Sequence, residues 1–213
     1  MKHAVESYRQ SLSSPPFRRA FAFSLAALIF GIIVNFFAGT YATYRASNYV
    51  EDIVLSNTPV FQVDDLFVLG TFVLVAFVAA LAFARPHWVP FTAASLGVFY
   101  TVRAIFISLT HLGPFPDRVQ LDWGSVVTSF IGGNDLFFSG HTGAPFLLAL
   151  IFWRERLLRY FFLAWSVFFA VIVLLGHVHY SIDVLSAYFI TYTIFHICER
   201  LFRRYREYFW GRV

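Results

Sequence analysis

Long apolar runs recur along the chain and are separated by short polar stretches. A helix needs about 20 apolar residues to cross the hydrocarbon core of a bilayer. Six runs have about this length, at residues 17–40, 66–84, 89–112, 136–153, 157–176 and 182–202. The fourth run is the least regular, because its first third is polar. The pattern predicts an all-α fold, an integral-membrane bundle of six transmembrane helices.

Little sequence lies outside these runs, so we expect one compact membrane domain. Residues 17–202 would form this six-span domain, after a polar N-terminal segment at 1–16 and before a basic tail at 203–213. The first run is too long for the core of a signal peptide, and no small-residue cleavage site follows it. We therefore expect the first span to be retained.

Composition and charge support a membrane protein and a definite topology. Charged residues make up 13% of the chain, whereas soluble domains carry about 25%. All of the 16 Lys and Arg residues except Arg45, Arg103 and Arg118 lie on one side of the six-span arrangement. The positive-inside rule then predicts that both termini are cytoplasmic. The net charge of +4 is thus a topology signal, and we expect no nucleic-acid partner.

The acidic residues gather on the other side, and so does the sequence GHVHYSID at 176–183. This loop should therefore face the periplasm, the cell exterior or an organelle lumen. Ionisable groups at membrane depth are costly and mark functional candidates. Three polar clusters qualify, and all belong to this outer half.

The first cluster is Arg103, which has apolar neighbours on both sides and should face the bundle interior. One interpretation is a buried ion pair with an aspartate, for which the candidates are Asp64, Asp65 and Asp122. The other is a clamp for an anion, because the planar guanidinium fork suits phosphate.

The second cluster is NDLFFSGHTGAP at 134–145, which places His141 between glycines and hydroxyl side chains. Glycine lets the backbone approach a ligand closely, and Pro145 suits the first turn of a helix. Free N–H groups at a helix N-terminus favour an anion. The alternative interpretation is a capped helix start with an incidental histidine.

The third cluster is GHVHYSID itself. If the last helix starts near His179, then His179 and Asp183 are four residues apart and share a helix face. Asp183 would hold one ring nitrogen and leave the other free to react, while His177 would project differently. The sequence offers no thiolate near His177 and His179 and few carboxylates, so we expect no metal and no cofactor. Cys198 is the only cysteine, which excludes a disulfide within the chain.

Together the clusters fit one chemistry, which is nucleophilic attack on phosphorus. Arginine and helix-start amides would hold a phosphate, a neutral imidazole would attack it, and a second histidine would protonate the leaving oxygen. The Gly-x-Ser-x-Gly turn of serine hydrolases is missing around Ser139. Walker and Gly-x-Gly-x-x-Gly phosphate loops are absent as well.

At these residues the chain resembles the type-2 phosphatidic acid phosphatase superfamily of six-span enzymes, and within it the sphingomyelin synthase branch. Residues 134–142 are similar to the branch motif Gly-Asp-x-x-x-Ser-Gly-His-Thr, and 179–184 to His-Tyr-Thr-x-Asp-Val. Residues 100–114, with Arg103, look like the arginine-bearing third span, and 59–65 match a Pro-rich motif loosely.

The resemblance implies a role for each matching residue. His179 would attack phosphorus and form a phosphohistidine, and Asp183 would orient and charge that ring. His141 would protonate the diacylglycerol oxygen and then act as the base for the acceptor. Asp135 would tune His141 or bind a cationic head group. Besides Asp135, the residues expected to bind substrate are Arg103, Ser139, Gly140, Thr142, Tyr180 and His177. For His177 we expect a supporting or head-group role.

Departures from the classical phosphatase pattern narrow the substrate. That pattern has a Lys-x6-Arg-Pro motif and a Ser-Arg pair before the second histidine, but Lys2 is the only lysine here, and Val173 stands six residues before His179. Fewer cations favour a monoanionic phosphodiester over a dianionic monoester. We therefore predict a lipid phosphotransferase or phospholipase C acting on phosphatidylcholine or phosphatidylethanolamine, with a ceramide-like alcohol or water as acceptor.

Two alternatives remain open from the sequence. One is a lipid phosphate phosphatase acting on phosphatidic acid or a polyprenyl diphosphate with the same histidines. The other is a non-enzymatic membrane protein in which the polar clusters form a structural network or relay.

Overall fold

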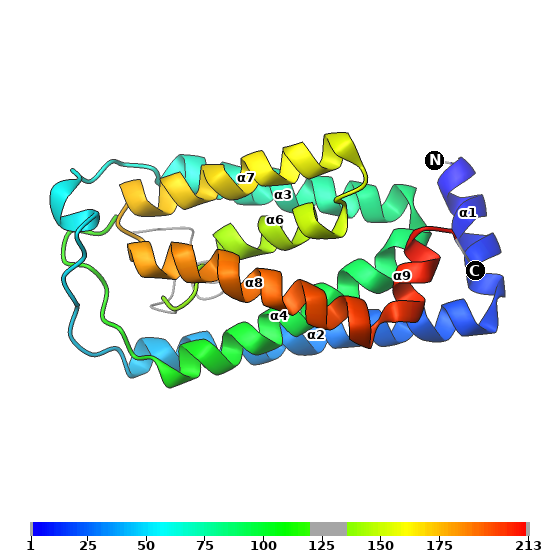
Figure 1. Ribbon diagram of the computed structural model, residues 1–213, viewed down its shortest axis with the longest axis horizontal. Helices are drawn as coiled ribbons and strands as arrows, with labels where there is room; N and C mark the ends of the chain where they lie inside the picture. Colours follow the sequence, from blue (N-terminus) through cyan, green and yellow to red (C-terminus); the bar gives the residue numbers. More distant parts are fainter. Residues whose placement is uncertain (1, 120–135, 212–213) are drawn as a thin grey trace.

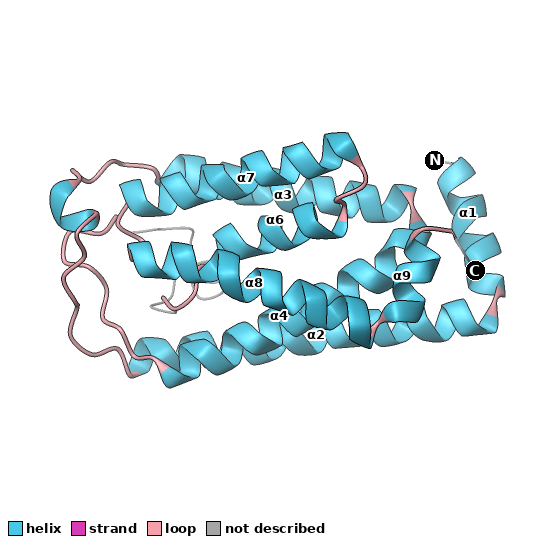
Figure 2. Ribbon diagram, in the orientation of Figure 1, coloured by secondary structure: helices cyan, strands magenta, loops and turns pink. Residues whose placement is uncertain are grey.

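The computed structural model describes residues 2–119 and 136–211, and the regular structure in these two ranges is helical throughout (Figures 1 and 2). This confirms the all-α prediction. Two short 3-10 helices, η1 (Leu55–Asn57) and η2 (Pro86–Trp88), lie in connections. The α-helices are α1 (Lys2–Ser13), α2 (Pro15–Tyr44), α3 (Asp64–Ala84), α4 (Val89–Leu109), α6 (Gly140–Ile151), α7 (Arg156–Leu175), α8 (Ser181–Leu201) and α9 (Arg203–Phe209).

Five helical segments are long and apolar enough to cross a membrane: α2, α3, η2 with α4, α7 and α8. Large apolar side chains such as Leu109 and Phe189 are three-quarters exposed on their outer surfaces. In water such surfaces would be unfavourable, whereas in lipid they are solvated. The chain is therefore a multi-pass membrane protein. The count of six spans and the cytoplasmic side of the termini stay predictions.

The fourth predicted span differs from the others. Over 136–153 the helix α6 occupies only Gly140–Ile151, 12 residues, or about 18 Å at 1.5 Å per residue, which is short of the ~30 Å hydrocarbon core. The polar start of this run explains the difference, because Ser139 caps the helix and the described residues before it, 136–138, are not helical. Residues 147–151 of α6 are buried within the bundle, where α6 packs on α7 and α8.

Helices α2 and α4 form the closest pair in the bundle. A Cβ atom on Gly97 of α4 would lie 2.5 Å from the carbonyl oxygen of Ala27 on α2, so the two backbones touch. Small residues allow this approach in membrane bundles. The pair carries Asn35 on α2 and Arg103 on α4, which contact each other near the functional cluster described below.

The two terminal segments are folded parts of the bundle. The Tyr8 hydroxyl of α1 donates a hydrogen bond to the Ala82 carbonyl at 2.8 Å. Phe209 of α9 is 1% exposed and belongs to the main core, stacked on Trp88 at a ring distance of 5.7 Å. Both termini lie at one end of the bundle, and the loop before α8 lies at the other (Figure 1). The predicted tail at 203–213 thus begins with a packed helix, although its cytoplasmic location is untested.

Candidate functional site

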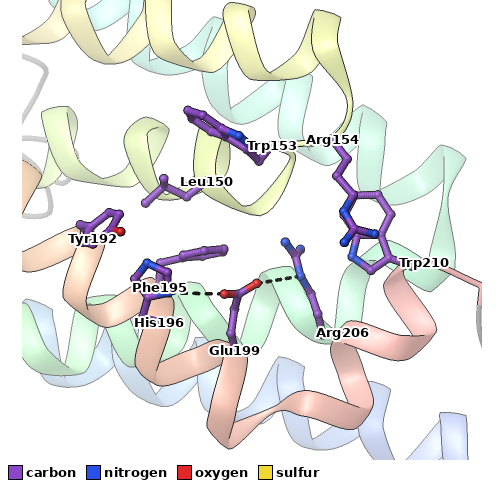
Figure 3. Close-up of a pocket in the computed structure, with 9 residues that line it drawn as sticks. All are labelled: Leu150, Trp153, Arg154, Tyr192, Phe195, His196, Glu199, Arg206 and Trp210. Carbon is purple, nitrogen blue, oxygen red and sulfur yellow. Dashed lines mark ion pairs between the residues drawn. The ribbon is translucent and has the colours of Figure 1, made fainter.

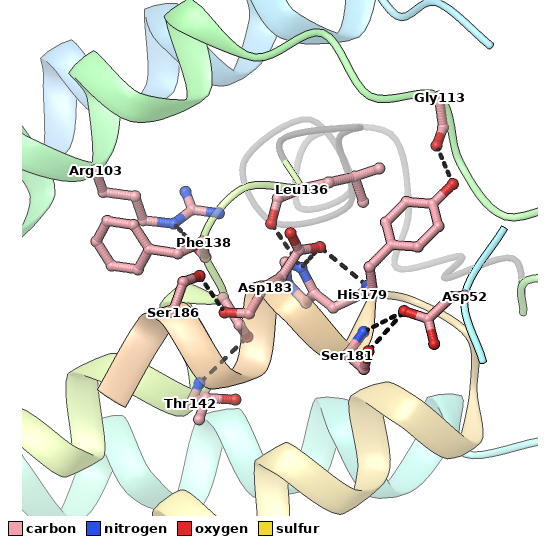
Figure 4. Close-up of polar contacts among 12 residues, drawn as sticks. Asp52, Arg103, Gly113, Leu136, Phe138, Thr142, His179, Ser181, Asp183 and Ser186 are labelled. Carbon is pink, nitrogen blue, oxygen red and sulfur yellow. Dashed lines mark hydrogen bonds and ion pairs between the residues drawn. The ribbon is translucent and has the colours of Figure 1, made fainter. Parts of the chain in front are cut away.

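Three predicted clusters meet at one short non-helical segment, residues 136–139 (Figure 4). The Arg103 Nε atom donates to the Phe138 carbonyl at 2.9 Å, and His179 Nδ1 lies 2.9 Å from the Leu136 carbonyl oxygen. The Ser139 N–H donates to the Asp183 carbonyl at 3.1 Å. Irregular backbone at membrane depth must be satisfied by protein groups. The same residues that the sequence proposes for chemistry provide these hydrogen bonds.

The contact with Leu136 determines which nitrogen of His179 can react. A backbone carbonyl oxygen only accepts hydrogen bonds, so Nδ1 must carry the hydrogen that joins them. In the neutral ring, Nε2 then holds an unprotonated lone pair. The ring is 6% exposed and is fixed on its Nδ1 side. The arrangement therefore presents Nε2 as a nucleophile or base.

Asp183 stabilises the loop before α8 as well as the imidazole. Its Oδ2 atom accepts the Tyr180 N–H at 2.9 Å and lies 3.4 Å from His179 Nδ1. We predicted that this pair would share a helix face, but α8 begins at Ser181, so His179 precedes the helix. The pair forms because Asp183, in the first turn, reaches back to the residue before the helix, as capping side chains do.

Arg103 is 5% exposed and lies against the first residue of α6. Its Nη1 atom donates to Asn35 Oδ1 at 3.1 Å, and a Cβ atom on Gly140 would be 3.0 Å from its Nε. Glycine at 140 therefore leaves the space that the guanidinium occupies. Of the aspartates considered as its ion-pair partners, Asp64 and Asp65 lie in the first turn of α3, and Asp122 is outside the described residues. The ion-pair interpretation therefore stays a prediction.

The N-terminus of α6 differs from the prediction in one respect. The helix begins at Gly140, so Pro145 is in its interior rather than in its first turn. The physical reason is the cap, in which the Ser139 hydroxyl accepts the Thr142 N–H at 3.4 Å and starts the helix earlier. Pro145 consequently donates no hydrogen bond to the His141 carbonyl. The Thr142 carbonyl accepts from the Ser166 hydroxyl at 2.8 Å, which ties this turn to α7.

His141 lies in the first turn of α6 and is partly buried. Its ring packs on Phe67 of α3, at a centroid distance of 4.4 Å, and on Phe169 of α7, at 5.5 Å. These contacts direct the ring toward α3 and α7, whereas the His179 ring contacts Leu136 and Asp183. The predicted pairing of the two histidines as acid and nucleophile stays a prediction.

Tyr180 and His177 make structural contacts with neighbouring loops. The Tyr180 hydroxyl donates to the Gly113 carbonyl at 2.8 Å and accepts from the Val50 N–H. His177 has a positive φ of 53°, and its Nε2 lies 3.1 Å from the Thr58 carbonyl oxygen. Both side chains are buried. Their expected substrate contacts therefore stay predictions, while their observed role is to fix the loop that carries His179.

Asp52 is a site-supporting residue that the sequence reasoning missed. This buried loop carboxylate accepts both the backbone N–H and the hydroxyl of Ser181, at 2.7 and 2.8 Å. Its other oxygen accepts the N–H groups of Val54 and Leu55 at 2.9 and 3.1 Å. Asp52 thus caps α8 from a distant loop, with a favourable charge at the helix N-terminus. No local spacing could have revealed a partner 129 residues away.

The protonation of Asp52 should affect stability at low pH. Burial raises the pKa of its carboxyl, but hydrogen bonds from Ser181, Leu55 and Val54 outweigh this effect and lower the pKa below its ordinary value. The contribution to stability is therefore complete above the unfolded-state pKa of about 3.9 and is lost as pH falls through the folded-state pKa.

We expect Asp52→Asn to lower the free energy of unfolding by about 1–3 kcal/mol near neutral pH, because hydrogen bonds to a charged acceptor are lost. The difference from wild type should disappear in strong acid, as measured by thermal unfolding in detergent from pH 7 downward. Ser181→Ala, which removes one of the four bonds, should have a smaller effect. A deficit for Asp52→Asn that is unchanged at low pH would contradict the charged cap.

Two further expectations concern residues or ligands that the structure does not test. Asp135, expected to tune His141 or bind a head group, lies outside the described residues. Within residues 2–119 and 136–211, no group of three or more His, Cys, Asp or Glu side chains is placed to hold a metal. The absence of a metal and of other cofactors stays a prediction.

Comparison with known proteins found a similarity to one protein family. No curated protein and no solved structure is significantly similar to the chain. Residues 132–200, which contain the α6 N-terminus and the His179 to Asp183 loop, match the family described as PAP2 superfamily C-terminal. Phosphatase or phosphotransferase activity on lipids is typical of that superfamily. The match covers 69 of the 213 residues, and this part of the chain is similar to the PAP2 superfamily.

Proposed function

We propose that the protein is a membrane lipid phosphotransferase or phospholipase C that cleaves a phosphodiester phospholipid through a phosphohistidine. The observation that supports this most directly is the 2.9 Å contact between His179 Nδ1 and the Leu136 carbonyl, which leaves Nε2 as the free nitrogen. The buried Asp183 carboxylate beside Nδ1 would stabilise the positive ring as Nε2 forms a bond.

In the first half of the proposed reaction, the donor phosphate lies near Arg103 and the N-terminus of α6. His179 Nε2 attacks phosphorus, an N–P bond forms, and the P–O bond to diacylglycerol breaks. The departing oxygen takes a proton from His141, and the head-group phosphate stays on His179. In the second half, His141 takes the proton of the acceptor hydroxyl, whose oxygen attacks phosphorus and breaks the N–P bond.

The charge of the site favours a phosphodiester. A diester head group such as phosphocholine or phosphoethanolamine carries one negative charge on phosphate, whereas a phosphomonoester carries close to two at neutral pH. Arg103 is a cation that contacts the 136–139 segment. The only lysine of the chain, Lys2, is in α1 at the other end of the bundle. The Arg103 guanidinium and the amides at the helix N-terminus suit a singly charged phosphate.

The family match favours a second candidate, a lipid phosphate phosphatase with water as acceptor. This reaction would act on phosphatidic acid or a polyprenyl diphosphate and would use the same His179 and His141. It requires the site to hold a more negative phosphate with the same arginine. Inorganic phosphate, rather than diacylglycerol with a phosphorylated head group, would be the diagnostic product.

A product assay separates these reactions. Purified protein in detergent would be incubated with acyl-labelled phosphatidylcholine or phosphatidylethanolamine, with and without ceramide, and the lipids analysed by mass spectrometry. We expect labelled diacylglycerol in either case and a new head-group-bearing sphingolipid if a ceramide-like alcohol is the acceptor. Release of inorganic phosphate from phosphatidic acid, without diacylglycerol from either diester, would replace the first candidate with the second. A fully inactive but folded protein would favour a non-enzymatic role.

A further inference from the structure

A pocket lies near the C-terminal end of α8, away from His179 (Figure 3). The residues of α8 that line it, from Tyr192 to Glu199, follow His179 by about 20–30 Å along the helix axis, so this pocket is distinct from the proposed active site. It has a volume of about 450 Å³, enough for a small ligand or part of a lipid. It is formed by the C-terminal ends of α6 and α8, the connection after α6, and α9.

One face of α8 brings polar side chains into this pocket. Tyr192, His196 and Glu199 follow each other at helical spacing, and all three line the pocket. Glu199 lies 3.5 Å from His196 Nδ1 on one side and 3.5 Å from the Arg206 Nε of α9 on the other (Figure 3). Polar groups on the outer face of a spanning helix are costly unless they are paired or functional. Here Glu199 pairs with both His196 and Arg206 at the edge of the pocket.

The pocket carries an excess of positive charge. Arg206 is anchored by a 2.7 Å hydrogen bond from Nη1 to the Ile151 carbonyl, and Arg154 lies 5.0 Å over the Trp210 ring. The pKa of Arg206 is lowered to about 10, mainly by burial and also by repulsion from Arg154, while attraction to Glu199 opposes this shift. Two guanidinium groups therefore face a single carboxylate. An anion beside Arg154 would relieve the repulsion.

The shape of the pocket is amphiphilic. Leu150 and Phe195 form an apolar wall, and Tyr192 and Trp153 are 53% and 49% exposed on the outer surface of the bundle. Tryptophan and tyrosine are typical of the level where lipid head groups meet hydrocarbon. Exposed Arg154 lines the same pocket and forms its cationic rim. This combination of groups matches a lipid that places its head group at the rim and its chain along the wall.

We propose that this pocket binds an anionic phospholipid from the leaflet next to the chain termini, with the head-group phosphate at Arg154 and an acyl chain along Leu150 and Tyr192. This inference does not rest on the proposed function, because its residues and its readout are separate from His179. Exposed Arg154 provides the charge, while the anchored Arg206 shapes the pocket floor.

The test is lipid binding to the full chain purified in detergent. Native mass spectrometry would measure retention of phosphatidylglycerol and of phosphatidylcholine by wild type, Arg154→Gln and Arg156→Gln. Arg156 is a matched control, because it is exposed in the same stretch but does not line the pocket. We expect preferential retention of phosphatidylglycerol by wild type and Arg156→Gln, and about five-fold weaker retention by Arg154→Gln, the effect of one arginine near an anionic lipid.

A photoreactive phosphatidylglycerol analogue locates the bound lipid independently. We expect crosslinked peptides that contain Trp153 or Trp210. Equal phosphatidylglycerol retention by Arg154→Gln and Arg156→Gln would overturn the proposal, as would equal retention of phosphatidylcholine by wild type or crosslinks confined to the His179 end. None of these outcomes depends on whether the protein turns over a lipid.

Discussion

His179→Asn is expected to eliminate lipid cleavage while leaving the fold intact. The asparagine amide nitrogen can replace Nδ1 as the donor to the Leu136 carbonyl, but the variant has no Nε2 atom. The structural hydrogen bond is therefore kept and the nucleophile is removed. We expect the rate of diacylglycerol release to fall by on the order of 10⁴-fold, as when a member of a catalytic triad is lost. Thermal unfolding should stay close to that of wild type.

His179→Ala provides the comparison, because it removes both the nucleophile and the donor to Leu136. It should be as inactive as His179→Asn but less stable, by about 1–3 kcal/mol for a buried carbonyl left without its partner. Wild type incubated with head-group-labelled phospholipid should acquire an acid-labile protein label that both variants lack. Activity of His179→Asn within ten-fold of wild type would show that His179 is not the nucleophile.

Arg103→Met is expected to reduce both stability and activity. The side chain has similar length and is apolar, so it fills space but leaves the Phe138 carbonyl and Asn35 without their described donor. We expect a loss of about 2–4 kcal/mol in the free energy of unfolding, because buried polar groups are left unsatisfied. Turnover should fall by about 10²–10³-fold from the lost charge at the phosphate.

Arg103→Lys separates these two effects. It keeps the positive charge but cannot donate in two fixed directions as the guanidinium does. We therefore expect intermediate activity, with a higher KM for the phospholipid and a partial loss of stability. If Arg103→Met were as active as wild type in a folded preparation, the phosphate-binding role of Arg103 would be excluded. Substrate turnover and thermal unfolding in the same detergent would provide both measurements.

Much of the architecture was accessible from the apolar pattern. Runs of spanning length predicted all-α structure, and five of the six expected spans correspond to long helices. The polar groups within these runs also indicated the site, because intramembrane polarity is costly and few explanations other than function or pairing account for it. The structure brings several of these polar residues together at 136–139, namely Arg103, Ser139, His179 and Asp183. Asn35 carried the same signal, an amide inside an apolar run, but was overlooked.

The parts that sequence could not supply are backbone contacts and long-range caps. A carbonyl is present at every residue, so nothing in the sequence indicated that Leu136 would fix His179. Asp52 is one acidic loop residue among several, and its pairing with Ser181 is a tertiary contact. Pro145 was expected in the first turn of α6 but lies in its interior, and α8 begins at Ser181 rather than near His179. Capping side chains rather than apolar periodicity determine where these helices begin.

The short helix α6 has a consequence for how this protein is made. A 12-residue helix cannot be inserted stably as an independent span, since its neighbouring backbone at 136–139 would be exposed to lipid. That backbone obtains its hydrogen bonds from Arg103, synthesised before it, and from the α8 region, synthesised after it. We therefore expect membrane integration of this segment to be completed only when the last helix is in place. Biogenesis of the bundle and assembly of the histidine site would then be a single, late event.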